Sequence, residues 1–145
     1  MDVSEVNQAL ETLGTLSLLR LISKKRVLDL DRQKLMGVLN VTPDSFSDGG
    51  KFWSFDKALE HARKMISLGA EWLDIGGESS GPGSRAISFD EELSRVMPLI
   101  EVLRRESESW LSVDTWKSAV AAEAIDGGVD YVNDVTALRG DPKMA

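Results

Sequence analysis

The chain has 145 residues, of which 42% are hydrophobic and 28% charged, so we expect one ordinary globular domain rather than a disordered chain. Its net charge of −7 disfavours general binding to nucleic acids, and the absence of cysteine excludes disulfides and thiolate metal sites. Asp2 and Glu5 stand where a secretory signal would be basic, and no apolar run reaches the roughly 20 residues of a membrane span, so we expect a soluble, cytoplasmic protein.

The first 25 residues predict a helix appended to the domain. Apolar side chains recur there at three- and four-residue spacing and lead into the run Leu18 to Ile22, with residues 23–26 as a basic end. We therefore assign residues 1–33 to an N-terminal extension that packs on the domain or on a partner and carries no chemistry. The apolar positions are Val3, Val6, Leu10, Leu13 and Leu16.

From residue 34 onward, short apolar runs alternate with helical patterns. Residues 34–39, 72–75, 110–113 and 131–135 predict buried strands, because each is a short apolar segment followed by turn residues. Apolar side chains with helical periodicity fill the segments between them. The predicted helices lie around residues 55–66, 88–103 and 119–125.

The ends of these helices carry their own signals. Ser88 with Glu91 three residues later predicts a capping box, whereas Gly69 and the pair Gly127-Gly128 predict helix ends. Pro98 is expected to kink the second helix because it has no amide hydrogen to donate.

Strands separated by helical crossovers predict an α/β fold with a parallel sheet. The pattern alone does not choose between a barrel and an open doubly wound sheet, although no Gly-x-Gly-x-x-Gly follows the first strand. Asp141-Pro142 is a typical helix opening, but only three residues follow it in the sequence. We interpret this as a truncated chain or as half of a larger domain.

Polar residues cluster just after the carboxyl ends of the predicted strands. Asn40, Asp74, Asp114 and Asn133 are delivered by four successive strands, and ligands of parallel α/β folds bind at this end. Carboxylate and amide groups match the donors of a pterin or guanine edge, and oxygen ligands suit Mg²⁺.

The segments 39–50, 74–80, 112–115 and 132–134 resemble the signatures of dihydropteroate synthase, in the family's order and spacing. The first of them reads Leu-Asn-Val-Thr-Pro-Asp-Ser-Phe-Ser-Asp-Gly-Gly. The resemblance implies a TIM-type (β/α)₈ barrel, of which residues 34–145 form about the first four β/α units. It also implies a transferase of folate biosynthesis that joins 6-hydroxymethyl-7,8-dihydropterin diphosphate to 4-aminobenzoate and releases diphosphate.

The resemblance further implies roles for individual residues. Asn40 would hold Mg²⁺ on the leaving diphosphate. Asp114 would be the catalytic residue, because it would hydrogen-bond the pterin and stabilise the cation formed as the C–O bond breaks. The other substrate-binding residues would be Thr42, at the start of a mobile loop that runs to Gly50, and Asp74, Ser80, Pro82 and Asn133.

Two departures from the family pattern limit what we expect of this chain. Gly81 stands where the family has an arginine that grips an anion, and Arg85 is a candidate replacement. Further pterin- and anion-binding residues belong to the family's second half, which is absent, so we predict that these 145 residues are not an efficient synthase alone. The resemblance implies a homodimer for a full-length chain.

Three alternatives stay open at this point. The chain could be a non-catalytic pterin-binding half-barrel module, which light scattering would reveal as a stable dimer, or an inert fragment. It could also be a pterin-dependent methyltransferase domain. The long signature beginning at Asn40 argues against the methyltransferase, because in the family that loop serves diphosphate and aminobenzoate.

Overall fold

A computed structural model describes residues 20–23, 26–42, 51–79 and 85–145. The chain divides into two compact units, residues 1–34 and residues 35–145. No helix in these described ranges is both long enough and apolar enough to span a membrane.

The N-terminal unit contains an antiparallel hairpin of β1 (Arg20–Ile22) and β2 (Val27–Asp29). An ion pair of 2.7 Å joins Arg20 Nε to Asp29 Oδ1 across the hairpin, and the amide of Ser23 donates to the carbonyl of Arg26. The predicted N-terminal helix is therefore wrong at its C-terminal end, because residues 20–22 are extended and pair with a second strand. The part of that helix over residues 1–19 lies outside the described residues.

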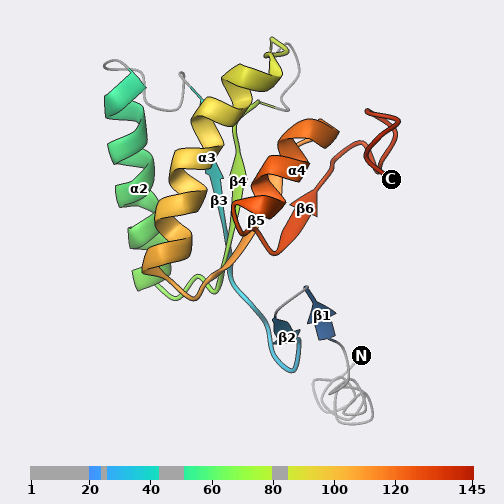
Figure 1. Cartoon of the computed structure of the whole chain (residues 1–145). Helices are drawn as coiled ribbons and strands as arrows, with labels where there is room; N and C mark the ends of the chain where they lie inside the picture. Colours follow the sequence, from blue (N-terminus) through green and yellow to red (C-terminus); the bar gives the residue numbers. More distant parts are fainter. Residues whose placement is uncertain (1–19, 24–25, 43–50, 80–84) are drawn as a thin grey trace, which may run out of the picture. The chain divides into compact units, whose positions relative to one another are not determined.

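The second unit is a parallel sheet with helical crossovers, shown in Figure 1. Its order along the sheet is β3-β4-β5-β6, the same as along the chain, and all three strand pairs are parallel. The strands are β3 (Met36–Asn40), β4 (Trp72–Gly76), β5 (Trp110–Asp114) and β6 (Tyr131–Asn133), and the helices are α2 (Lys51–Ser67), α3 (Phe89–Glu106) and α4 (Ser118–Asp126). The predicted parallel α/β class is confirmed.

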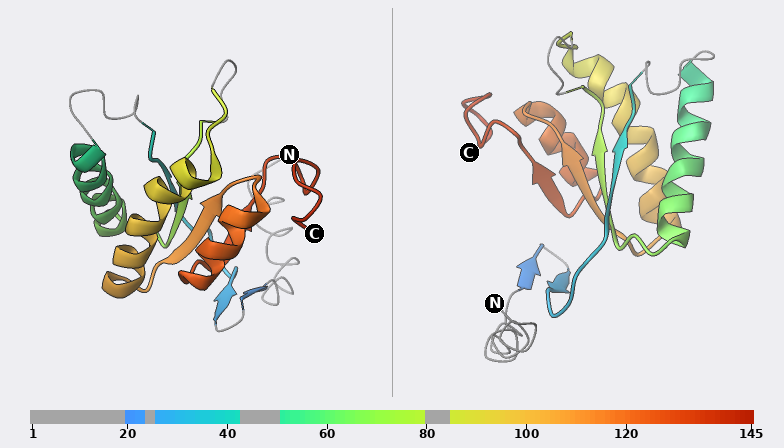
Figure 2. Two further views of the ribbon diagram at one scale, coloured as in Figure 1. Left: turned by 45° about the horizontal axis from the view of Figure 1, so that its top comes forward. Right: turned by 180° about the vertical axis from the view of Figure 1, so that it is seen from behind.

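All three helices cover the same face of the sheet, as both views of Figure 2 show. Strand side chains that point to this face are apolar and fully buried, among them Leu39, Leu73 and Val113. They pack against helix residues such as Ile100 and Val120, which are also inaccessible to solvent. Burial of this apolar surface is the main contribution that holds the helices on the sheet.

The helix ends follow the sequence signals closely. The Ser88 side chain accepts from the Glu91 amide at 3.2 Å, and Gly69 adopts a φ of 100°, which only glycine reaches without strain. Pro98 lies within α3 without ending it.

Strand β6 ends at Asn133, two residues earlier than predicted, because the Asp134 carboxylate accepts from the amides of Thr136 and Leu138 and turns the chain.

Asp141 does not begin a helix within the described residues. Its Oδ2 atom accepts from the amide of Ser118 at 2.9 Å and from the Ser118 hydroxyl at 2.6 Å. Ser118 is the first residue of α4, and Lys117, at the N-cap position, makes no side-chain cap of its own. The predicted cap residue thus caps the preceding helix, which holds residues 134–141 near the start of α4.

Candidate functional site

The face of the sheet opposite the helices carries the polar strand residues. The register aligns Asn40 with Gly76, Gly76 with Asp114, and Asp114 with Asn133 at the carboxyl ends of the strands. Asp74 lies in the next row toward the amino ends, beside Ser112. The structure therefore brings together, on one face, the four polar residues that the sequence placed at strand ends.

Asp74 and Asn133 are joined directly, although 59 positions separate them in the chain. The amide Nδ2 of Asn133 donates to Asp74 Oδ2 at 2.9 Å, and the hydroxyl of Ser112 donates to Asp74 Oδ1. Asp74 is only 3% exposed, so these donors compensate the burial of its carboxylate. Asp74 is the buried member of the pair and lies one row below Asn133, which is exposed.

Asp114 is the site carboxylate with a clearly altered acidity. Its pKa is raised to about 6, first because burial penalises the charged form and then because Asp74, Glu92 and Asp134 are negative neighbours. A half-buried carboxylate in this environment favours a nearby positive charge, since a cation would offset both causes. The same property suits a site where positive charge develops during a reaction.

Asn40 lies beside Gly76, and the geometry there bears on the predicted Mg²⁺ site. A Cβ atom added to Gly76 would lie 3.1 Å from Asn40 Oδ1 and 3.6 Å from Asp114 Oδ2, so the absence of a side chain keeps two oxygens accessible to one small space. Among the described residues there is no group of three His, Cys, Asp or Glu side chains arranged to hold a metal. This donor set fits an Mg²⁺ that keeps most of its ligands as water and phosphate.

The sequence analysis missed a largely buried ion cluster around Lys117. Lys117 Nζ contacts Glu78 Oε2 and lies 2.5 Å from Oε2 of Glu92, whose side chain has no exposed surface. The cluster joins the turn after β4, the first turn of α3 and the turn after β5. The only sequence signal was two acidic residues and a lysine in loops and first turns, which is ordinarily a solvated pattern.

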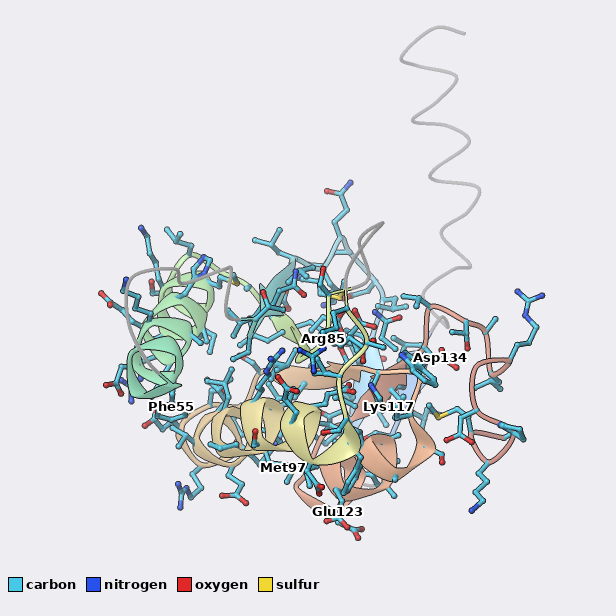
Figure 3. The ribbon with its side chains drawn as sticks, turned by 90° about the horizontal axis from the view of Figure 1, so that it is seen from above. Phe55, Arg85, Met97, Lys117, Glu123 and Asp134 are labelled. Carbon is cyan, nitrogen blue, oxygen red and sulfur yellow. The ribbon has the colours of Figure 1, made fainter. Side chains whose placement is uncertain are left out.

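Figure 3, which views the strands from their carboxyl ends, labels Lys117 just before α4 and Asp134 just after β6, whereas Phe55, Met97 and Glu123 lie on the helices α2, α3 and α4. The pKa of Lys117 is raised: burial lowers it, but the hydrogen bonds to Glu78 and Glu92 outweigh that effect. Lys117 also lies 4.7 Å from the ring centroid of Trp116, which adds a cation–π contact. The lysine is therefore charged and held in place.

Aromatic side chains occupy the same sheet face below the polar rows. Tyr131 stacks with Trp72 at a centroid distance of 5.1 Å and with Trp110 at 5.7 Å. The indole Nε1 of Trp72 donates to Ser112 Oγ at 2.8 Å. Trp72 therefore takes part in the polar network as well as in the aromatic packing.

The remaining predicted site residues are placed as follows. Thr42 is buried two residues after the end of β3, at the beginning of the first signature loop. Ser80, Gly81 and Pro82 lie outside the described residues, so their predicted roles stay predictions. Arg85 is exposed, and its suggested replacement of the family arginine also stays a prediction.

A family model described as pterin binding enzyme matches residues 36–145. The chain therefore belongs to the pterin binding enzyme family. Among curated relatives, the dihydropteroate synthase of Bacillus subtilis is 54% identical over 115 residues, covering 79% of this chain and 40% of that enzyme. The dihydropteroate synthase of Haemophilus influenzae is 46% identical over 121 residues, covering 83% and 44%.

Solved structures give the same result. The 7,8-dihydropteroate synthase of Vibrio fischeri is 51% identical with a TM-score of 0.72, and the alignment covers 83% of this chain and 43% of that one. The Xanthomonas albilineans dihydropteroate synthase, solved with 4-aminobenzoic acid, is 48% identical with a TM-score of 0.78, covering 83% and 45%. The chain thus spans less than half the length of these relatives.

Proposed function

We propose that this chain supplies the pterin-binding strands of a dihydropteroate synthase, and that the complete enzyme condenses 6-hydroxymethyl-7,8-dihydropterin diphosphate with 4-aminobenzoate. One observation carries the proposal: Asn40, Asp114 and Asn133 share the carboxyl-end row of one sheet face, directly above the buried Asp74. Membership of the pterin binding enzyme family supports it. The remaining strands of an eight-stranded barrel would come from polypeptide beyond these residues.

In the proposed reaction the C–O bond between the pterin methylene group and diphosphate breaks, and a bond from that carbon to the aminobenzoate nitrogen forms. The amine releases a proton, so diphosphate and 7,8-dihydropteroate are the products. Asp114 would stabilise the positive charge that develops on the pterin as the C–O bond breaks. Asn133 and Asp74 would bind the donor-rich edge of the heterocycle.

We propose Asn40 as the residue that binds Mg²⁺, which when present would neutralise charge on the leaving diphosphate. The oxygens beside Gly76 support this assignment, because Mg²⁺ commonly takes one or two protein ligands together with phosphate. Cytoplasmic location and, for a full-length enzyme, a homodimer complete the proposal.

Calorimetric titration of the chain with 6-hydroxymethylpterin tests the pterin site. Wild-type protein should bind, and Asp114→Asn should bind at least tenfold more weakly because a charge-assisted hydrogen bond is lost. The matched control is Asp126→Asn at the end of α4, which should bind like wild type. Absence of binding by wild-type protein, or equal binding by the two variants, would contradict the proposed function.

A further inference from the structure

The hydrogen bonds around Asp74 form a chain whose direction is fixed by its first member. An indole N–H can only donate, so Ser112 Oγ must accept from Trp72 Nε1. The single proton of Ser112 is then directed to Asp74 Oδ1. The Trp72 indole thus determines which way the Ser112 hydroxyl points.

The same reasoning applies to Asn133, at the exposed end of this series of hydrogen bonds. An ionised Asp74 is acceptor-only, so Asn133 must turn its NH₂ group toward Asp74 Oδ2, at 2.9 Å. The amide oxygen of Asn133 is then the group presented away from Asp74. A ring with N–H donors on its edge would meet an acceptor there, which matches a pterin.

Trp72 and Ser112, with which this series of hydrogen bonds begins, are held rigidly. Ser112 is 2% exposed, and the Trp72 ring packs against both Trp110 and Tyr131, with centroid distances of 6.3 Å and 5.1 Å. A buried hydroxyl that both accepts and donates has no rotational freedom left. A polar network satisfied in this way holds its members in one arrangement.

We propose that Trp72 and Ser112 are positioning residues for the pterin site: by hydrogen bonding in series, they orient the Asp74–Asn133 pair so that Asn133 presents its amide oxygen to the ligand. The inference rests on the proposed function for the identity of the ligand. The orientation of the Asn133 side chain is a property of the protein without ligand.

The test uses Trp72→Phe and Ser112→Ala, with Trp110→Phe as the matched control. Trp110→Phe also removes an indole group from this aromatic cluster. It leaves in place the indole of Trp72, which is the one that donates to Ser112. In NMR spectra, the side-chain amide resonances of Asn133 should shift in Trp72→Phe and Ser112→Ala and stay in place in Trp110→Phe. Unchanged Asn133 resonances in both test variants would overturn the inference, whether or not a pterin binds.

Titration with 6-hydroxymethylpterin supplies the second measurement. Each test variant should weaken binding by about threefold to tenfold, the effect of one hydrogen bond, and Trp110→Phe should not. The double variant Trp72→Phe/Ser112→Ala should bind like Ser112→Ala alone, because both changes interrupt the same series of hydrogen bonds. Wild-type affinity in both single variants would overturn the inference while leaving the proposed function intact, and failure of wild-type protein to bind would contradict the proposed function alone.

Discussion

The ammonium group of Lys117 lies 2.5 Å from the carboxylate of Glu92, a side chain with no exposed surface. Removing the charge by Lys117→Met would leave that carboxylate buried without its cation. Breaking a buried pair in this way costs about 3–5 kcal/mol, a large part of the stability of an ordinary domain. We therefore expect Lys117→Met to lower the free energy of unfolding by this amount, measured by urea denaturation at pH 7.

The matched control for Lys117→Met is Arg63→Met. Arg63 makes two hydrogen bonds of 2.7 Å and 2.9 Å to Glu106, but both side chains are exposed. Exposed ion pairs contribute little because water solvates the separated charges. Similar losses of stability in the two variants would show that burial of Glu92 does not determine the effect.

Gly76 and Gly77 are neighbours whose substitutions should have different effects. An alanine Cβ at position 77 would lie 2.9 Å from Val96 Cγ1 and 3.1 Å from the backbone oxygen of Glu92, so Gly77→Ala should lower the free energy of unfolding by about 1–3 kcal/mol. At position 76 the nearest atom is Asn40 Oδ1, at 3.1 Å on the site face. Gly76→Ala should instead displace Asn40 with less effect on stability.

The measurement for this pair is calorimetric titration with diphosphate and Mg²⁺, combined with urea denaturation. Gly76→Ala should weaken binding about tenfold, the equivalent of one charge-assisted contact, and folded Gly77→Ala should bind like wild type. If Gly76→Ala binds as wild type does, the proposed Mg²⁺ site beside Asn40 is wrong.

The raised pKa of Asp114 predicts a pH-dependent stability difference. Because the folded-state pKa of about 6 exceeds the ordinary value of 3.8, the folded state binds more protons between these values, and stability falls as pH rises through that window. Asp114→Asn removes the charge and should be more stable than wild type at pH 7, by about 1 kcal/mol because a half-exposed carboxylate stays partly solvated. Denaturation at pH 7 and pH 4 should show this advantage shrinking at the lower pH, and a constant difference would contradict it.

Asp141 predicts the opposite dependence on pH. Hydrogen bonds from the Ser118 hydroxyl and from the Lys143 and Ser118 amides lower the pKa of Asp141 to about 2. Its contribution to stability is therefore complete above the ordinary value near 4 and is lost as pH falls toward 2. Thermal unfolding of Asp141→Ala should show a deficit at pH 6 that narrows at pH 3, and a deficit that does not change with pH would exclude this role.

Local signals in the sequence were sufficient for most of the secondary structure of the second unit. Strands β3 to β5 and all three helices fall where apolar periodicity and capping residues predict them, because each depends on neighbours within one element. The early end of β6 has a local cause in the Asp134 turn, whereas two other errors arose where distant residues decide. Residues 20–22 form a strand because they pair with β2, and Asp141 caps α4 because the turn after β6 returns to that helix.

The sequence by itself determined the family and the parallel α/β class. It also determined the four polar residues that meet at the strand ends, since strand spacing and alternation position these residues. Only the tertiary structure decided how those residues are supported. The contacts of Lys117 with Glu92 and of Trp72 with Ser112 join residues 25 and 40 positions apart, and the sheet register and helix packing bring them together. Hydrogen bonds and ion pairs act over a few ångströms, so a one-dimensional pattern does not specify which distant partners lie within reach.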